Sequence, residues 1–117
     1  MELVALLSTG EGTWAQVAGL IKQGEWDKII LIGSDFARKF QVESNKEIEF
    51  IEIRERRLVE LKKELQNKLK GKIDGTEVAL SIASGEGREH MALISALLSQ
   101  PVGVRFTALT KEGIVML

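Results

Sequence analysis

The stretch Val78 to Leu98 reads VALSIASGEGREHMALISALL. Its first part, Val78 to Ala83, is an apolar run typical of a buried strand. The turn Ser84-Gly85-Glu86-Gly87 follows, and apolar residues then recur at helical spacing from Arg88 to Leu98. The stretch therefore predicts a strand, a glycine-rich loop and the start of a helix. Helix starts carry unpaired N–H groups and a partial positive charge, so they attract anions.

A second copy of this plan opens the chain. Leu3 to Leu7 is continuously apolar, as in a strand that is buried on both faces of a parallel sheet. The loop Ser8-Thr9-Gly10-Glu11-Gly12 comes next, and Thr13-Trp14-Ala15-Gln16 has the pattern of a capping box at a helix start. Two strand–loop–helix units are thus predicted, one at each of these glycine-rich loops.

The other segments complete an alternating order of strands and helices. Further strands are expected at Ile29–Ile32, 47–53 and, as a hairpin, at 104–109 and 114–117; further helices are expected at 34–40, with Ser34 as N-cap, and at 55–70. The buried stripe of the helix at 55–70 is predicted to be Leu58, Leu61, Leu65 and Leu69. The helix after the second loop is expected to carry its large apolar residues on one side, at Met91, Ile94, Leu97 and Leu98.

This alternation predicts one α/β domain over residues 1–117. The expected fold is Rossmann-like and doubly wound, with a mostly parallel sheet in the order 3-2-1-4-5-6 and a C-terminal antiparallel hairpin. In that order strands 1 and 4 are central neighbours, and a crevice opens beyond their carboxyl ends. Both glycine-rich loops are expected at that crevice.

Composition excludes several classes of protein. The chain has 117 residues, 44% of them hydrophobic, a net charge of −1, no cysteine and one histidine. Disulfides and cysteine-based metal sites are therefore excluded, and we predict no metal and no cofactor. No signal peptide or membrane-spanning run is present, so we expect a cytoplasmic protein with no membrane partner and no duplex DNA partner.

Small residues of the two loops are the candidate ligand-binding groups. The glycines allow a ligand to approach the backbone closely, and the hydroxyls add hydrogen-bond donors. The alternative interpretation is that these residues only turn the chain sharply. The predicted ligand-binding residues are Ser8, Thr9, Gly10, Gly12, Ser34, Ser84, Gly85, Glu86, Gly87 and Arg88.

Charged residues near the loops give both evidence for and evidence against a phosphate-binding site. Glu11 and Glu86 weaken a simple phosphate site, unless they point outward or contact ribose hydroxyls or a base. Arg88 begins a helix, where a cation opposes the helix dipole, and this cost favours a functional role. His90 is either an acid–base group or a partly buried histidine bonded to the backbone. Neither loop is a Walker motif or a complete dinucleotide fingerprint.

Arginines that follow the third strand form a further candidate surface. Arg54, Arg56 and Arg57 are expected at the same edge of the sheet as the two loops. They are either a positive rim for an oligonucleotide or an ordinary solvated surface.

Both loops resemble motifs of CRISPR-associated Rossmann-fold (CARF) domains. Leu6-Leu7-Ser8-Thr9-Gly10 resembles the first motif of that family, and the segment from Ile82 to Leu93 is similar to the second. The family's second turn is Thr/Ser-Gly-Gly-Thr-Lys-like, whereas this chain has Glu86-Gly87-Arg88. Arginine still binds phosphate, but its high pKa makes it a poor proton donor.

The resemblance implies a cytoplasmic homodimer that binds a cyclic oligoadenylate, or another nucleotide messenger, as a sensor or sequestering module of CRISPR-type defence. One alternative that it implies is a metal-independent ring nuclease. The matching residues are then Ser8 or Thr9 and Arg88, with His90 as a further candidate that moves protons. In such a reaction a 2′-hydroxyl attacks its neighbouring phosphate. A third alternative is a non-catalytic interaction subunit, so enzymatic activity stays open.

Overall fold

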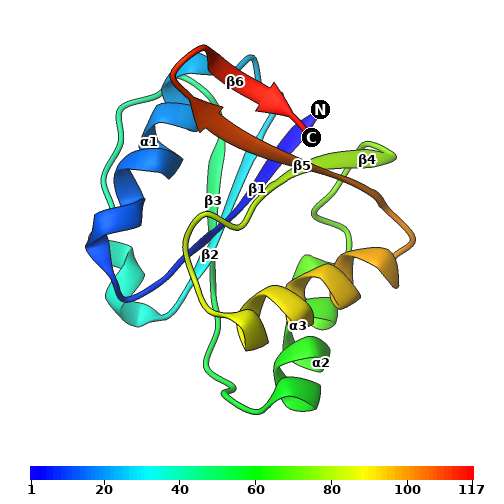
Figure 1. The fold of residues 1–117 in the computed structure, drawn as a ribbon. Helices are drawn as coiled ribbons and strands as arrows, with labels where there is room; N and C mark the ends of the chain where they lie inside the picture. Colours follow the sequence, from blue (N-terminus) through cyan, green and yellow to red (C-terminus); the bar gives the residue numbers. More distant parts are fainter.

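The computed structural model describes residues 1–10 and 12–117 with their side chains. In this described part, the chain forms six strands, three α-helices and two short 3-10 helices, and Figure 1 shows how they are arranged. The strands are β1 (Glu2–Leu7), β2 (Ile29–Gly33), β3 (Ile48–Glu52), β4 (Glu77–Ser81), β5 (Gly103–Thr110) and β6 (Gly113–Met116). The helices are η1 (Glu11–Thr13), α1 (Trp14–Gln23), η2 (Asp35–Lys39), α2 (Leu58–Leu69) and α3 (Gly87–Leu98).

The strands form one sheet in the order β3-β2-β1-β4-β5-β6. All neighbours are parallel except β5 and β6, which form an antiparallel hairpin. The predicted fold class, strand order and hairpin are confirmed. β1 and β4 are central neighbours, in a register that pairs Leu3 with Ala79 and Ala5 with Ser81. The direction of winding reverses between them, as expected of a doubly wound sheet.

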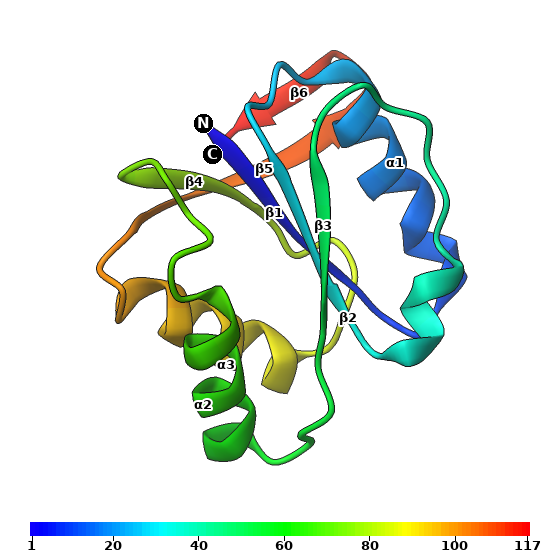
Figure 2. The same ribbon diagram turned by 180° about the vertical axis from the view of Figure 1, so that it is seen from behind.

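Helices cover both faces of the sheet. α1 and η2 lie on one face, and α2 and α3 lie on the other (Figures 1 and 2). Each face has its own apolar core, and every residue of β1 and β2 is buried, which explains the continuously apolar sequences from Leu3 to Leu7 and from Ile29 to Ile32. Within the described part of the chain, the structure has no helix of the length and apolarity needed to cross a membrane.

Two of the predicted helix faces are partly wrong. Leu61, Leu65 and Leu69 of α2 are buried as expected, but Leu58, the first residue of the helix, is 38% exposed. In α3 the buried residues are Ala92, Leu93, Ala96 and Leu97. Met91 and Leu98, which were expected on one apolar side of this helix together with Leu97, are 57% and 56% exposed. The small alanines let α3 approach the rest of the core closely, and this turns the large side chains at positions 91 and 98 outward.

The ends of α1 and η2 were located well, but their chemistry differs from the prediction, and α2 begins at Leu58, three residues later than expected. Thr13 is the N-cap of α1 and Ser34 is the N-cap of η2, yet neither side chain makes a capping hydrogen bond. The predicted capping box at Thr13 is therefore wrong, because its hydroxyl instead donates to the carbonyl of Gly10 at 3.4 Å. Gly24 ends α1 as expected, with its N–H bonded to the carbonyl of Leu20.

Candidate functional site

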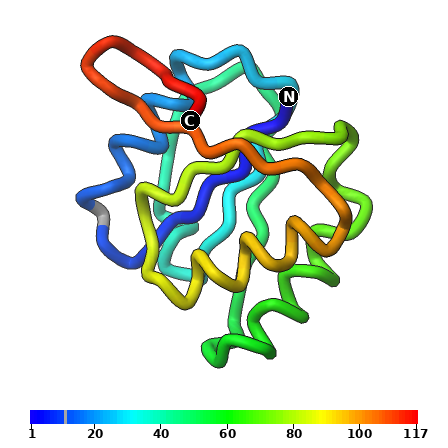
Figure 3. Tube along the Cα trace, turned by 45° about the vertical axis from the view of Figure 1, so that its right-hand side comes forward, coloured from blue at the N-terminus to red at the C-terminus, as the bar shows by residue number. Residues whose placement is uncertain are grey.

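The two glycine-rich turns are joined by a serine pair. Ser84 is buried, and its hydroxyl accepts a hydrogen bond from the backbone N–H of Ser8 at 2.7 Å. The same hydroxyl lies 2.9 Å from the hydroxyl of Ser8, to which it donates. In Figure 3 the turn after β1 and the turn after β4 run side by side. The predicted convergence of these two loops, 76 residues apart in sequence, is confirmed.

Gly85 makes the second turn possible. Its φ is +104°, a region that L-residues with a side chain rarely adopt. A Cβ at this position would lie well under 3.0 Å from the side chain of Leu6, which is fully buried and cannot move aside. The other three loop glycines have no positive φ, and a Cβ at Gly12 or Gly87 would meet no atom within 4 Å. Among the loop glycines, only Gly85 is required by the backbone itself.

A cleft of about 580 Å³ opens at the carboxyl ends of β1 to β4. It lies where ligands bind in doubly wound sheets, and its volume is within the usual range of ligand pockets. Buried Leu7, Ile53 and Leu61 form its apolar wall. Its polar lining consists of Ser8, Thr9, Ser34, Asp35, Glu52, Arg54, Glu55, Arg56, Gly85, Glu86, Arg88 and Glu89.

Six of the predicted ligand-binding residues line this cleft: Ser8, Thr9, Ser34, Gly85, Glu86 and Arg88. The cleft is not lined by the other four, which are Gly10, Gly12, Gly87 and Ser84. Ser84 is buried, and it joins the two turns through its hydrogen bonds with Ser8. Arg54 and Arg56 line the cleft as a positive rim would, whereas Arg57 does not. Glu11, considered above for its charge, lies outside the described side chains.

Sequence analysis missed the acidic part of the lining. Asp35, Glu52, Glu55 and Glu89 join Glu86, so five carboxylates face three arginines. Asp35 lies two residues after the end of β2, and Glu52 is the last residue of β3. Their positions at the carboxyl ends of these strands are the signal that could have identified them. The lining therefore has a net formal charge of −2, from five acids and three bases.

Two of the three arginines are paired with carboxylates. Arg54 Nε donates to Glu52 at 2.9 Å, and Glu52 also accepts from Arg38 Nε at 2.9 Å. Arg88 bonds to Glu86 at 2.6 Å. These hydrogen bonds, that from Arg54 first and that from Arg38 second, hold the pKa of Glu52 below its usual value. Among the described residues, no carboxylate lies within ion-pair distance of the exposed Arg56.

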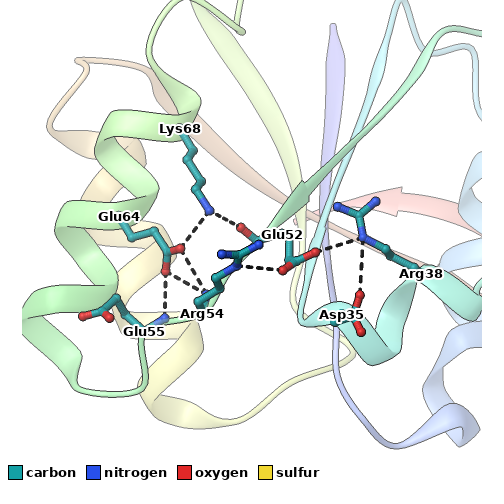
Figure 4. A network of polar contacts seen from close by, with 7 residues as sticks. All are labelled: Asp35, Arg38, Glu52, Arg54, Glu55, Glu64 and Lys68. Carbon is teal, nitrogen blue, oxygen red and sulfur yellow. Dashed lines mark hydrogen bonds and ion pairs between the residues drawn. The ribbon is translucent and has the colours of Figure 1, made fainter.

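Glu64 of α2 holds the arginine-bearing segment in place (Figure 4). Its carboxylate accepts hydrogen bonds from the backbone N–H groups of Arg54 at 3.0 Å and Glu55 at 2.9 Å, and from Lys68 Nζ at 2.8 Å. Burial alone would raise the pKa of Glu64, but the bonds from Lys68 and from these backbone groups together lower it. The carboxylate therefore fixes one wall of the cleft while remaining charged.

The start of α3 is already occupied by the protein's own charges. Glu89 accepts a hydrogen bond from the backbone N–H of Glu86 at 2.9 Å. Carboxylates at this end of a helix favour its dipole, and they compete with any external anion. An anion that binds at the N-terminus of α3 would therefore have to compete with the carboxylates of Glu86 and Glu89.

His90 and Ser8 are both held by local hydrogen bonds. His90 Nε2 lies 2.9 Å from the carbonyl of Ser84, which accepts its proton, and the ring does not line the cleft. This geometry matches the partly buried, backbone-bonded interpretation of His90. The hydroxyl of Ser8 accepts from Ser84 and from the N–H of Gly10, and it donates to the carbonyl of Gly10 at 3.3 Å.

Trp14 supports the first turn from behind. Its indole N–H donates to the carbonyl of Ser8 at 3.0 Å, and its ring packs against Phe36 and Phe40, each at 5.8 Å between centroids. Trp14 is thus a packing residue that fixes Ser8. Among the residues whose side chains are described, no group of three or more His, Asp or Glu converges in a way that would hold a metal ion.

Comparison with known proteins identifies the fold only. No protein-family model matches the chain, and no curated protein matches it. Its structure is similar to that of protein VC1899 from Vibrio cholerae, with a TM-score of 0.65 and 14% sequence identity. The match covers 99% of this chain and 33% of that protein, so the chain spans about a third of that neighbour's length.

Proposed function

We propose that this protein binds a cyclic oligoadenylate, or a related nucleotide messenger, in the cleft at the carboxyl ends of β1 to β4. The observation that carries the proposal is the bonding of Ser8 to Ser84, because it brings both motif-bearing turns to one crevice beside three arginines. The resemblance of both turns to CARF motifs supports the nucleotide class.

The lining has a partner for each part of such a ligand. Arg56 has no carboxylate partner in the described structure and is the first phosphate contact in this proposal. Carboxylates accept hydrogen bonds, so Asp35 and Glu55 suit ribose hydroxyls or the adenine amino group. The apolar wall of Leu7, Ile53 and Leu61 suits a base.

The acidic excess of the lining sets a cost for phosphate binding. Arg88 reaches a phosphate only by leaving Glu86, its present partner. Replacing Glu86 with glutamine removes that competition and one negative charge. At a separation of several ångströms near a protein surface, one charge contributes on the order of 1 kcal/mol, or about fivefold in Kd.

Binding is favoured over cleavage by the hydrogen bonds of the candidate catalytic groups. The hydroxyl of Ser8 and Nε2 of His90 each form hydrogen bonds within the turns themselves, and Arg88 is a poor proton donor. A ring nuclease, in which Thr9 and Arg88 position and stabilise the reacting phosphate, is therefore the second candidate. Thr9 is exposed and lines the cleft.

We also propose that the protein acts as a homodimer. Met91 and Leu98 lie seven residues apart on one side of α3, and both are more than half exposed. A second copy would cover these apolar side chains, and α3 begins beside the cleft. Light scattering after gel filtration tests this: the mass of a dimer is expected for the wild type and that of a monomer for Met91→Asp/Leu98→Asp. A monomeric wild type overturns it.

A thermal-shift panel tests binding. The ligands are cyclic tri-, tetra- and hexa-adenylate, with the linear oligomers as controls. A ligand at a hundredfold excess over its Kd stabilises the native state by about 2.7 kcal/mol, which raises Tm by roughly 10 °C. No shift with any ring contradicts the proposal. Chromatography of the recovered ligand separates the two candidates, since an intact ring excludes the nuclease.

Matched variants locate the site. Arg56→Ala is expected to weaken ring binding about tenfold, and Arg57→Ala, a neighbouring exposed arginine outside the cleft, is the control. Equal losses in the two variants would show that general positive charge, and not the cleft, binds the ligand. Unchanged stability across the whole panel favours the interaction-subunit alternative.

A further inference from the structure

β3 leaves one edge of the sheet open. The N–H of Ile29 donates to the carbonyl of Glu47, and the N–H of Ile53 donates to the carbonyl of Gly33, so positions 47 and 53 face β2. Because backbone groups alternate along a parallel strand, Ile48, Phe50 and Glu52 direct theirs away from the sheet. The carbonyl of Glu52 already accepts a hydrogen bond from Lys68 Nζ at 2.5 Å, so the carbonyls open to a partner are those of Ile48 and Phe50. Figure 2 shows β3 as the outermost strand on that side.

An apolar groove runs along this edge on the α1 face. Its volume is about 350 Å³, and it lies between β3 and the chain that leaves η2. Its apolar lining is Leu31, Ala37, Phe40, Val42, Ile48 and Phe50. Four of these side chains, those at positions 40, 42, 48 and 50, are only partly buried, so the groove has apolar surface available for contact.

The opposite face of the same edge is basic. A hollow of about 510 Å³ there is lined by Arg38, Arg54, Lys68, Lys70 and Lys72, against only Glu49 and Glu52. Five bases and two acids give this lining a formal charge of +3, although the whole chain has a charge of −1. Four of the five bases already pair with carboxylates, and Lys70 is the base of this lining that has no ion-pair partner among the described residues. Arg38 and Phe50 line both the groove and the hollow, so the two surfaces meet at the edge of β3.

We infer that the edge of β3 receives an extended segment of a partner protein in which apolar and acidic side chains alternate. Added strands gain main-chain hydrogen bonds from an open edge and gain specificity from alternate side-chain pockets. Successive side chains of a strand point to opposite faces. One set of side chains then enters the apolar groove, and the other set, if acidic, meets the lysines.

A second copy of this chain fits this edge poorly. Two-fold pairing of β3 with β3 keeps each face of the sheet on the same side. It would place Lys68, Lys70 and Lys72 of the two copies together, and such like-charge contacts are unfavourable. A nucleic acid would use the basic hollow and leave the apolar groove unfilled. The partner peptide is the occupant that uses both surfaces.

A designed peptide tests the inference. The probe is a blocked, fluorescein-labelled octapeptide that alternates valine and glutamate, compared by anisotropy with its valine–lysine counterpart and with an octamer of uridylate. The glutamate peptide is expected to bind at least tenfold more tightly than the lysine peptide, and to shift the amide resonances of Ile48, Phe50 and Glu52. Equal affinities, tighter binding of the RNA, or shifts confined to the cleft overturns the inference.

Two further controls separate the edge from general charge. Lys70→Glu is expected to weaken binding of the glutamate peptide about fivefold or more, whereas Lys63→Glu, an exposed lysine of α2 outside the hollow, leaves it unchanged. N-methylation of alternate peptide residues removes the donors on one edge of the probe. Methylation in one register is expected to abolish binding and in the other to preserve it; binding that survives both overturns the inference.

Discussion

Replacing Gly85 with alanine is expected to destabilise the protein severely. An alanine at a φ of +104° carries backbone strain on the order of 1–3 kcal/mol. Its Cβ would also overlap the side chain of Leu6, which has no exposed surface, and overpacking of this kind costs about 1–3 kcal/mol. The sum is roughly 2–6 kcal/mol, a large part of the stability of an ordinary domain.

Urea unfolding followed by tryptophan fluorescence measures this loss, and Gly87→Ala is the matched control. Gly87 is the first residue of α3 and has open space around it, so alanine there is expected to change the free energy of unfolding by less than about 1 kcal/mol. The reasoning is refuted if Gly85→Ala costs less than about 1 kcal/mol, or if both variants lose the same amount.

Three other predictions concern the same region. Ser84→Ala removes the tie to Ser8 and should cost about 1–3 kcal/mol, whereas Ser81→Ala, which deletes a buried hydroxyl without a partner among the described residues, should be neutral or stabilising in the same urea assay. The pKa of Glu64 is lowered in the folded state, so the stability that the charged carboxylate contributes is complete well above pH 4.5 and is lost as the pH falls below that value. The difference in free energy of unfolding between wild type and Glu64→Gln should therefore shrink on acidification, and a constant difference would contradict this. Glu86→Gln should tighten ring binding about fivefold in calorimetry, and weaker binding would count against the proposed phosphate contact of Arg88.

The strand order was predictable because it depends on patterns that burial imposes on sequence. The apolar runs from Leu3 to Leu7 and from Ile29 to Ile32 are typical of strands buried on both faces, and in the doubly wound order the loops after β1 and β4 meet at the crevice. Which loop glycine is essential was not predictable. Positive φ is a property of the folded turn, and the four glycines look alike in sequence.

Side-chain contacts between distant segments explain the remaining differences. Helix α2 was expected from residue 55, but Glu64 in its middle binds the N–H groups of Arg54 and Glu55, which requires that segment to run back beside the helix. The acidic lining of the cleft was missed for a related reason. Asp35, Glu52 and Glu89 come from three different elements, and only the folded sheet brings them together.

Amide-resolved titration of the ¹⁵N-labelled protein with cyclic tetra-adenylate, and with the tri- and hexa-adenylate rings in parallel, tests the central claim most directly. Residues of both turns and of the β3–α2 segment, including Ser8, Thr9, Gly85 and Arg56, are predicted to shift together along one saturation curve. Shifts on only one turn, shifts on a surface remote from both, or no shifts with any ring would contradict the account.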